Sequence, residues 1–104
     1  MKEVFSYNSS QTIAPLWDGN YVIFNPQGNV YVLLSRTVME SLPVGFETTI
    51  FRKGGTGNIR FTVDQGVYLN CMHAHPQSEK ENAVMFLKKT GDSEFWLHGD
   101  VKNS

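Results

Sequence analysis

Two segments of alternating character, on either side of a glycine cluster, constrain the fold of this chain most strongly. Apolar or β-branched residues recur at every second position of residues 46–50 and 59–63, which is typical of strands with one buried and one wet face. The residues expected on the buried face are Phe46, Thr48, Ile50, Ile59, Phe61 and Val63. Gly54, Gly55 and Gly57 can supply the positive φ angles of a three- or four-residue loop. We therefore expect a β-hairpin at the centre of the chain.

The remaining segments predict further short strands and almost no helix. Strand patterns recur at residues 4–7, 21–25, 30–35, 67–71, 83–89 and 94–98, with turn signals about every ten residues. On these strands the residues expected to face the core include Val30, Val32, Leu34, Ala83, Met85 and Leu87. Only residues 36–42 favour a helical turn, and residues 72–82 form the longest expected loop.

This spacing predicts an all-β fold, an antiparallel β-sandwich of jelly-roll type with seven to eight short strands. We expect a single domain over residues 1–104. Within it, residues 1–18 form an N-terminal arm or a first strand, and residues 101–104 form a frayed tail.

The balance of charged and apolar residues argues against several function classes. Hydrophobic residues make up 40% and charged residues 18% of the 104 residues, which is too apolar for a disordered chain. The formal net charge of −1 gives no field that would attract nucleic acid, and no apolar run approaches the roughly 18 residues that span a bilayer. We expect neither a nucleic-acid nor a membrane partner. The single cysteine, Cys71, excludes an intrachain disulfide.

Two groups of turn and core residues carry a family resemblance. The first runs from Leu42 to Asn70 and contains L-P-V-G, R-K-G-G-T-G, I-x-F and G-V-x-L-N in that order. The second, at residues 83–100, is similar to the ending L-x-K-T-G-x-x-x-W-x-L-x-G-D. In order and spacing, these motifs resemble a small β-domain that recurs in tailed-bacteriophage virion proteins, of the tail-fibre or head-decoration type. The resemblance covers roughly residues 19–100.

One departure from the family pattern predicts which side chains face outward. When the chain is aligned on Leu97 and on Gly99 with Asp100, the tryptophan of the family falls on Phe95 and not on Trp96. Because side chains alternate along a strand, we expect Phe95 and Leu97 to face the core and Trp96 and His98 to face away from it.

The resemblance implies a virion structural protein, often trimeric, and carries over no catalytic residue. Only about twenty residues precede the similar region, so we expect a small capsid decoration (cement) protein. It would be made in the bacterial host cytoplasm, self-associate as a homotrimer and bind the major capsid protein or another virion protein. The alternative is a tail-fibre or adhesin tip domain that binds host-surface glycans. We do not expect an enzyme.

Aromatic and basic residues are the candidate contact residues. Trp96, Tyr68, Tyr31 and Trp17, together with His98, are candidates for a subunit interface or a platform for sugar rings; burial by the rest of the chain is the alternative. Arg52, Lys53 and Arg60 cluster near the glycines. They are candidates for contact with an acidic patch on a capsid, and the alternative is an ordinary solvated face.

One cysteine and two histidines are the only candidates for metal binding or catalysis. Cys71, His73 and His75 fall at every second position, so on a strand they would share a face and could hold zinc. A polar loop is the alternative, and it is favoured by Pro76 and by the charges that follow. A Cys–His nucleophile would lack an identifiable orienting group. The run from Gly54 to Gly57 lacks the Lys-Ser/Thr and the helix of a phosphate loop. We therefore expect no metal and no cofactor.

Overall fold

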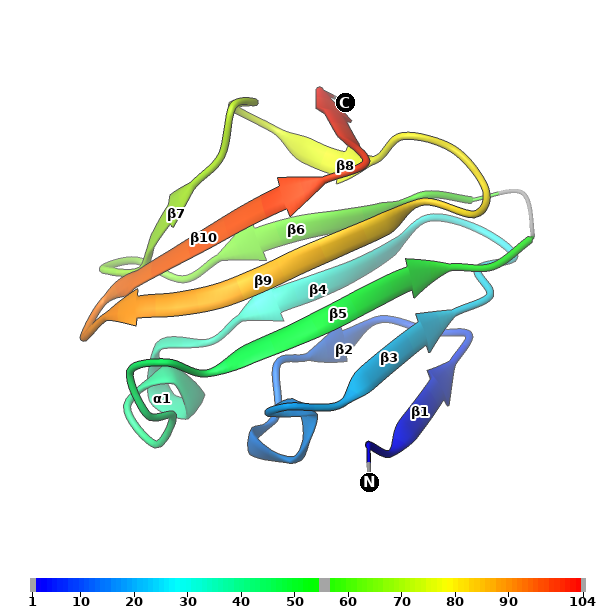
Figure 1. Cartoon of the computed structure of the whole chain (residues 1–104). Coiled ribbons are helices and arrows are strands. Elements are labelled where there is room, and N and C mark those ends of the chain that lie inside the picture. Colours follow the sequence, from blue (N-terminus) through cyan, green and yellow to red (C-terminus); the bar gives the residue numbers. More distant parts are fainter. Residues whose placement is uncertain (1, 55–56, 104) are drawn as a thin grey trace.

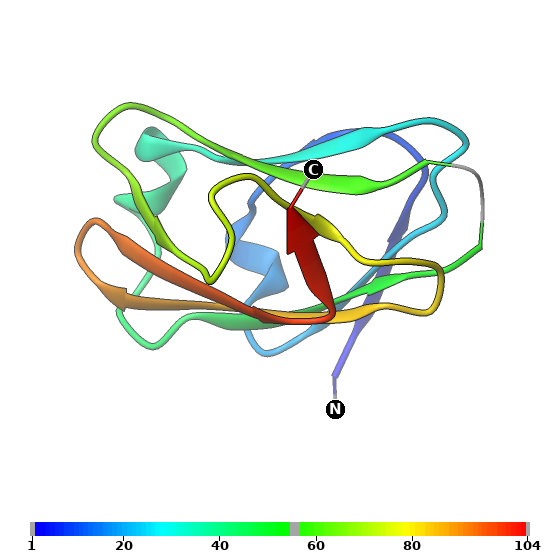
Figure 2. The same cartoon turned by 90° about the horizontal axis from the view of Figure 1, so that it is seen from above.

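The computed structural model describes residues 2–54 and 57–103, which contain eleven strands arranged in two sheets (Figure 1). Sheet A contains, in spatial order, β1 (Val4–Tyr7), β3 (Tyr21–Phe24), β5 (Glu47–Arg52), β9 (Val84–Gly91), β10 (Glu94–Gly99) and β7 (Tyr68–Asn70). Sheet B contains, in spatial order, β11 (Val101–Asn103), β8 (Pro76–Ser78), β6 (Ile59–Val63), β4 (Val30–Leu34) and β2 (Gln11–Thr12). The two sheets form two layers that face each other (Figure 2). The all-β prediction is confirmed.

The first six strands alternate between the sheets, and this produces parallel pairing. The odd-numbered strands β1, β3 and β5 are parallel neighbours in sheet A, and the even-numbered β2, β4 and β6 are parallel neighbours in sheet B. Antiparallel pairs join β5 to β9, β9 to β10, β6 to β8 and β8 to β11. Both sheets are therefore mixed, so the prediction of a purely antiparallel arrangement is wrong. The finer assignment to a jelly-roll-type sandwich stays a prediction.

The predicted central hairpin does not form, because β5 and β6 belong to opposite sheets. The segment between them crosses from one layer to the other; of its residues, Gly55 and Thr56 lie outside the described part of the chain. Glycine is needed at position 57 because there is no space for a side chain, and not because of a positive φ angle. A Cβ atom at this position would collide with the backbone carbonyl of Gly28, so the two loops can lie against each other only without a side chain.

The core lies between the layers and contains the inward residues of both sheets. The predicted inward faces of β4, β5, β9 and β10 are all buried, including Phe46, Ile50, Met85, Phe95 and Leu97. In β6, Ile59 and Phe61 are buried as expected, but Val63 at the end of the strand is exposed. Because both sheets place apolar side chains on their facing sides, the core is continuous across the described residues.

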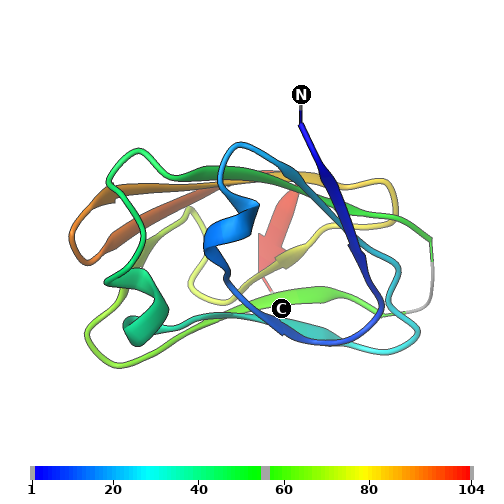
Figure 3. The same cartoon turned by 90° about the horizontal axis from the view of Figure 1, so that it is seen from below.

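The N-terminal residues belong to the fold. β1 confirms the predicted first strand, and its parallel neighbour is β3. Figure 3 shows this segment and the short 3₁₀ helix η1 (Pro15–Trp17) from below. Proline at the start of η1 fixes the turn that directs Trp17 into the core. There the indole Nε1 donates a hydrogen bond to the Tyr7 hydroxyl at 3.3 Å.

Two predictions for the C-terminal half are wrong. Residues 101–103, expected to fray, form β11 and pair with β8. β8 itself lies in the segment that was expected to be the longest loop, and all three of its residues are buried. Polar residues can be buried here because they are hydrogen-bonded: the Ser78 hydroxyl accepts from the Ile59 amide at 3.0 Å, and Gln77 accepts from Arg60 at 3.0 Å.

The predicted helical turn is confirmed as α1 (Arg36–Met39), and a buried lysine supports its C-terminal end. Ser35 caps the first turn through its hydroxyl, which accepts from the Val38 amide at 3.4 Å. The Lys89 Nζ donates to the carbonyls of Met39 at 2.9 Å and Leu42 at 2.6 Å. Lys89 lies on the inward face of β9 and is 4% exposed, so it connects sheet A to the helix end. No helix in the described part of the chain is long and apolar enough to cross a membrane.

Candidate functional site

The outer face of sheet A carries a cluster of aromatic side chains, which we call the aromatic face. It consists of Tyr21, Phe51, Tyr68, Phe86, Trp96 and His98. These residues alternate with buried ones along β3, β5, β9 and β10, so they point away from the core. Tyr68 is 67% exposed and Trp96 is 48% exposed, and His98 is exposed as well. A large aromatic surface on one sheet is a candidate interaction site.

The strand register arranges the face in rows that cross the sheet. One row runs through Val4, Tyr21, Thr49, Phe86 and His98, which are directly opposite one another on β1, β3, β5, β9 and β10. A second row places Ile23, Phe51 and Val84 side by side on β3, β5 and β9. The rows touch where Tyr21 meets Phe51 edge to face, with ring centroids 5.5 Å apart. The first row crosses five of the six strands of sheet A, and the members of the aromatic face lie on β3, β5, β9, β10 and β7.

Charged residues of both signs border the aromatic face. A third row contains Glu47, Lys88, Trp96 and Asn70 in this order, so Lys88 and Asn70 flank the tryptophan and Glu47 lies on the far side of Lys88. Near Trp96, the Glu94 carboxylate accepts a hydrogen bond from the Thr90 hydroxyl at 2.9 Å. This bond, with smaller contributions from the side chains of Asn70 and Trp96, lowers the pKa of Glu94. The carboxylate therefore stays charged beside the indole in mildly acidic solution.

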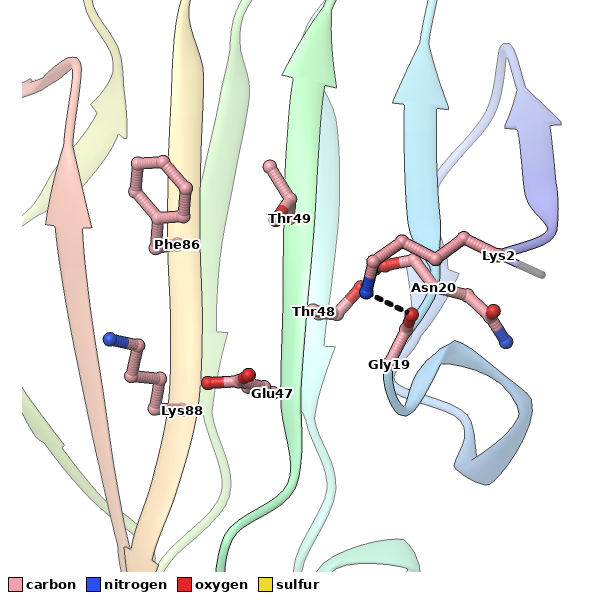
Figure 4. Close-up of a pocket in the computed structure, with 8 residues that line it drawn as sticks. All are labelled: Lys2, Gly19, Asn20, Glu47, Thr48, Thr49, Phe86 and Lys88. Carbon is pink, nitrogen blue, oxygen red and sulfur yellow. Dashed lines mark hydrogen bonds between the residues drawn. The ribbon is translucent and has the colours of Figure 1, made fainter.

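A shallow pocket of about 260 Å³ lies at the edge of the aromatic face (Figure 4). Phe86 and Lys88 of β9 line one side, Glu47 and Thr49 of β5 line the middle, and Lys2 lies across the start of β3. The Lys2 Nζ donates to the Gly19 carbonyl at 2.8 Å and lies 5.5 Å from the Tyr21 ring centroid. The pocket can accept a polar group from a partner that covers the aromatic rings.

The structure brings together three of the contact residues expected from the sequence. Trp96, His98 and Tyr68 all belong to the aromatic face, and the predicted outward direction of Trp96 and His98 is confirmed. Tyr31 is exposed as well, but it lies on the outer face of sheet B, opposite Arg60 in the register. Lys53 is exposed just beyond the end of β5. The expected aromatic group is therefore divided between the two outer faces of the molecule.

For two of the expected contact residues the prediction is wrong, because their side chains are buried. Trp17 is 1% exposed, since η1 turns its indole toward Tyr7. Arg52 is 6% exposed, since it shares the inward face of β5 with Thr48 and Ile50. Period-two alternation from Thr48 already places residue 52 on that inward face. A basic residue at such a position cannot belong to a solvated patch.

Sequence reasoning did not single out Tyr21, Phe51 and Phe86 as contact residues. The signal was available in the segments Y-V-I-F at residues 21–24 and V-M-F-L at residues 84–87, where both sets of alternating positions are apolar. Strands with apolar residues on both faces are usually packed against other protein surface on both sides. One face of sheet A packs against the core. The other face of sheet A is the aromatic face.

The candidate metal ligands do not converge. Residues 72–75 form a succession of bends, and Cys71 lies between them and the end of β7, so Cys71, His73 and His75 do not share a strand face. Within residues 2–54 and 57–103, no group of three histidine, cysteine, aspartate or glutamate side chains is placed to hold a metal ion. The Cys71 side chain is partly buried and packs against the core.

Comparisons of the chain with protein-family models, with curated proteins and with solved structures gave no match. The functional assignment therefore depends on the aromatic face and on the sequence motifs alone.

Proposed function

We propose that this chain is a structural protein of a tailed-bacteriophage virion, a small decoration protein that self-associates and binds the head surface. The observation that carries the proposal is the aromatic face, which is the kind of surface that subunit interfaces bury. Interface cores are enriched in tyrosine, tryptophan and phenylalanine and depleted in charge, and the aromatic face has this composition with its charges at the border.

The motifs that resemble virion domains support the proposal in a second way. Their residues occupy turns and core positions of the fold: Phe95 and Leu97 are buried, Gly99 ends β10, and Lys89 holds the end of α1. Motifs of this kind specify a scaffold, so the same scaffold can present different outer faces.

The dimensions of the molecule fit a role in assembly. It measures 34 × 34 × 20 Å, and the sheets are stacked along the short dimension (Figure 2). A stable interface needs about 800 Å² on each partner, which the broad face of sheet A can supply. In the proposed homotrimer, three such faces pack around a threefold axis. The buried area lowers the free energy of the assembled shell relative to its separated parts.

Binding to shells that lack the protein tests the proposal. The purified chain should co-sediment with such shells and raise their melting temperature, and Trp96→Ser with Phe86→Ser should weaken both effects. Tyr31→Ser is the matched control, because it removes an exposed aromatic residue from the opposite face. If the wild-type chain binds no shell surface, the decoration role is wrong.

A specific observation also favours the alternative of a glycan-binding tail-fibre tip. Trp96 and Tyr68 are both exposed, and each has a polar residue directly opposite it in the register: Asn70 opposite Trp96 and Glu94 opposite Tyr68. Exposed rings beside polar side chains are suited to sugar rings, and several copies would multiply a weak affinity. This alternative predicts that Trp96→Ala abolishes adhesion to host cells. Adhesion that survives in Trp96→Ala and Tyr68→Ala would exclude it.

A further inference from the structure

The outer face of sheet B carries a pocket of about 370 Å³, on the opposite side of the molecule from the aromatic face. Residues of β4, of β6, of the segment before β8 and of the start of β8 line it, among them Tyr31, Arg60, Thr62, Val63, His75 and Pro76. Arg60 is the one arginine or lysine in this lining, and no acidic residue is among the described residues that form it. The pocket is therefore positively charged without an internal counter-ion.

A directed hydrogen bond to a buried residue holds Arg60 in place. Its Nε donates to Oε1 of Gln77 at 3.0 Å, and Gln77 is 5% exposed on the neighbouring strand β8. In the described part of the chain, no carboxylate forms an ion pair with Arg60. Because Nε is already bonded, the two terminal amino groups of the guanidinium are left to meet a ligand. A guanidinium held in this way is pre-organised for a planar, bidentate acceptor.

The neighbouring groups complete a site for an anion with an apolar body. Lys102 follows Gln77 in the same row of sheet B and adds a second positive charge near the pocket. The hydroxyls of Tyr31 and Thr62 and the imidazole of His75 can hydrogen-bond to an acceptor, and Val63 and Pro76 offer apolar walls. The wall that carries His75 is tied to β11, because the His75 amide donates to the Asn103 side chain at 3.2 Å.

We infer that this pocket binds a carboxylate, with Arg60 as the bidentate donor. The carboxylate comes either from an acidic side chain of a partner protein or from an acidic sugar, since both present the same planar group on a partly apolar body. The inference does not require self-association through the aromatic face. It gives sheet B a recognition role in addition to the assembly role proposed for sheet A.

Titration of the ¹⁵N-labelled chain with paired small probes tests the inference. The acidic probes are N-acetylglutamate amide and N-acetylneuraminic acid, and their neutral partners are N-acetylglutamine amide and N-acetylmannosamine. We expect at least one acidic probe to shift the amide resonances around Tyr31, Arg60 and His75 together with the Arg60 Nε–H signal. The affinity of a single carboxylate should be about millimolar.

Substitutions at Arg60 separate a carboxylate site from a general positive surface. Arg60→Gln should weaken binding about tenfold or more, because it removes a charge-assisted pair of hydrogen bonds. Arg60→Lys keeps the positive charge but loses the planar pair of N–H donors, so this variant should bind the acidic probe with intermediate affinity. Arg36→Gln is the matched control; it removes an exposed arginine whose partner is Glu40, and it should bind as the wild type does.

Binding of the glutamate probe alone supports an acidic protein partner, and binding of the acidic sugar alone supports a glycan. The inference is overturned if neither acidic probe shifts the pocket resonances, if the neutral probes bind equally well, or if Arg60→Gln binds unchanged. A failure here leaves the proposed assembly role intact, because Trp96 and Phe86 lie on the other sheet.

Discussion

The imidazole of His98 stacks on the phenyl ring of Phe86, with ring centroids 5.1 Å apart and an angle of 21° between the planes. The two residues are directly opposite each other on β10 and β9, so the strand register itself brings the rings together. With the edge-to-face pair of Tyr21 and Phe51, this stacking fixes several rings of the aromatic face before any partner arrives. A partner that binds pre-ordered side chains loses less conformational entropy.

Replacement of Lys89 by methionine should lower the free energy of unfolding by about 2–4 kcal/mol, because the carbonyls of Met39 and Leu42 would lose their buried donor. Urea unfolding followed by tryptophan fluorescence measures the change. Lys88→Met is the matched control, since Lys88 directly precedes Lys89 but lies on the outer face. Equal stability of Lys89→Met and wild type would show that the lysine does not support the end of α1.

Acid should destabilise the protein partly through Glu94. Its pKa is lowered in the folded state, so the charged form contributes stability above the unfolded pKa, and this contribution is lost as the pH falls through the folded pKa. Glu94→Gln should therefore lose less stability than the wild type between neutral pH and pH values below the ordinary glutamate range. Urea midpoints across that range measure the difference. Glu79→Gln, which leaves the Glu94 carboxylate intact, should follow the wild type; identical curves for Glu94→Gln and wild type would contradict this role.

Gly99→Ala should destabilise the fold by about 2 kcal/mol or more. Gly99 has a φ of 109°, and an added Cβ would press against the Val84 carbonyl on the neighbouring strand. The substitution would therefore disturb the end of the β9–β10 pair. In the control Gly28→Ala, an added Cβ meets no heavy atom within 4 Å. Thermal unfolding of the two variants compares them, and a Gly99→Ala melting temperature equal to that of Gly28→Ala would contradict the expectation.

The direction of side chains could be predicted from the sequence, because it depends on local alternation alone. Phe46, Ile50, Phe95 and Leu97 face the core as the period of two requires. Strand pairing could not be predicted in the same way. A glycine-rich segment can close a hairpin or cross between layers, and the outcome here depends on long-range pairing: β5 pairs with β3 and β9, and β6 pairs with β4 and β8.

The candidate site could be predicted in part, for a similar reason. Trp96 and His98 were placed by alternation on a strand with a clear core face. The burial of the polar residues could not be predicted, because their hydrogen-bond partners come from distant parts of the chain. Gln77 depends on Arg60 and Ser78 on the Ile59 amide, and no short sequence window contains both partners. The pocket around Arg60 depends on the same long-range pairing.

The solution mass of the untagged chain, measured by light scattering, tests the central claim most directly. We expect the wild type to have three times the chain mass of 11.8 kDa. The variant Trp96→Ser with Phe86→Ser should have the mass of one chain while its circular dichroism spectrum remains that of a β protein. Tyr31→Ser, on the opposite face, should keep the trimer mass. A wild-type chain that stays monomeric at every concentration tested would contradict assembly through the aromatic face.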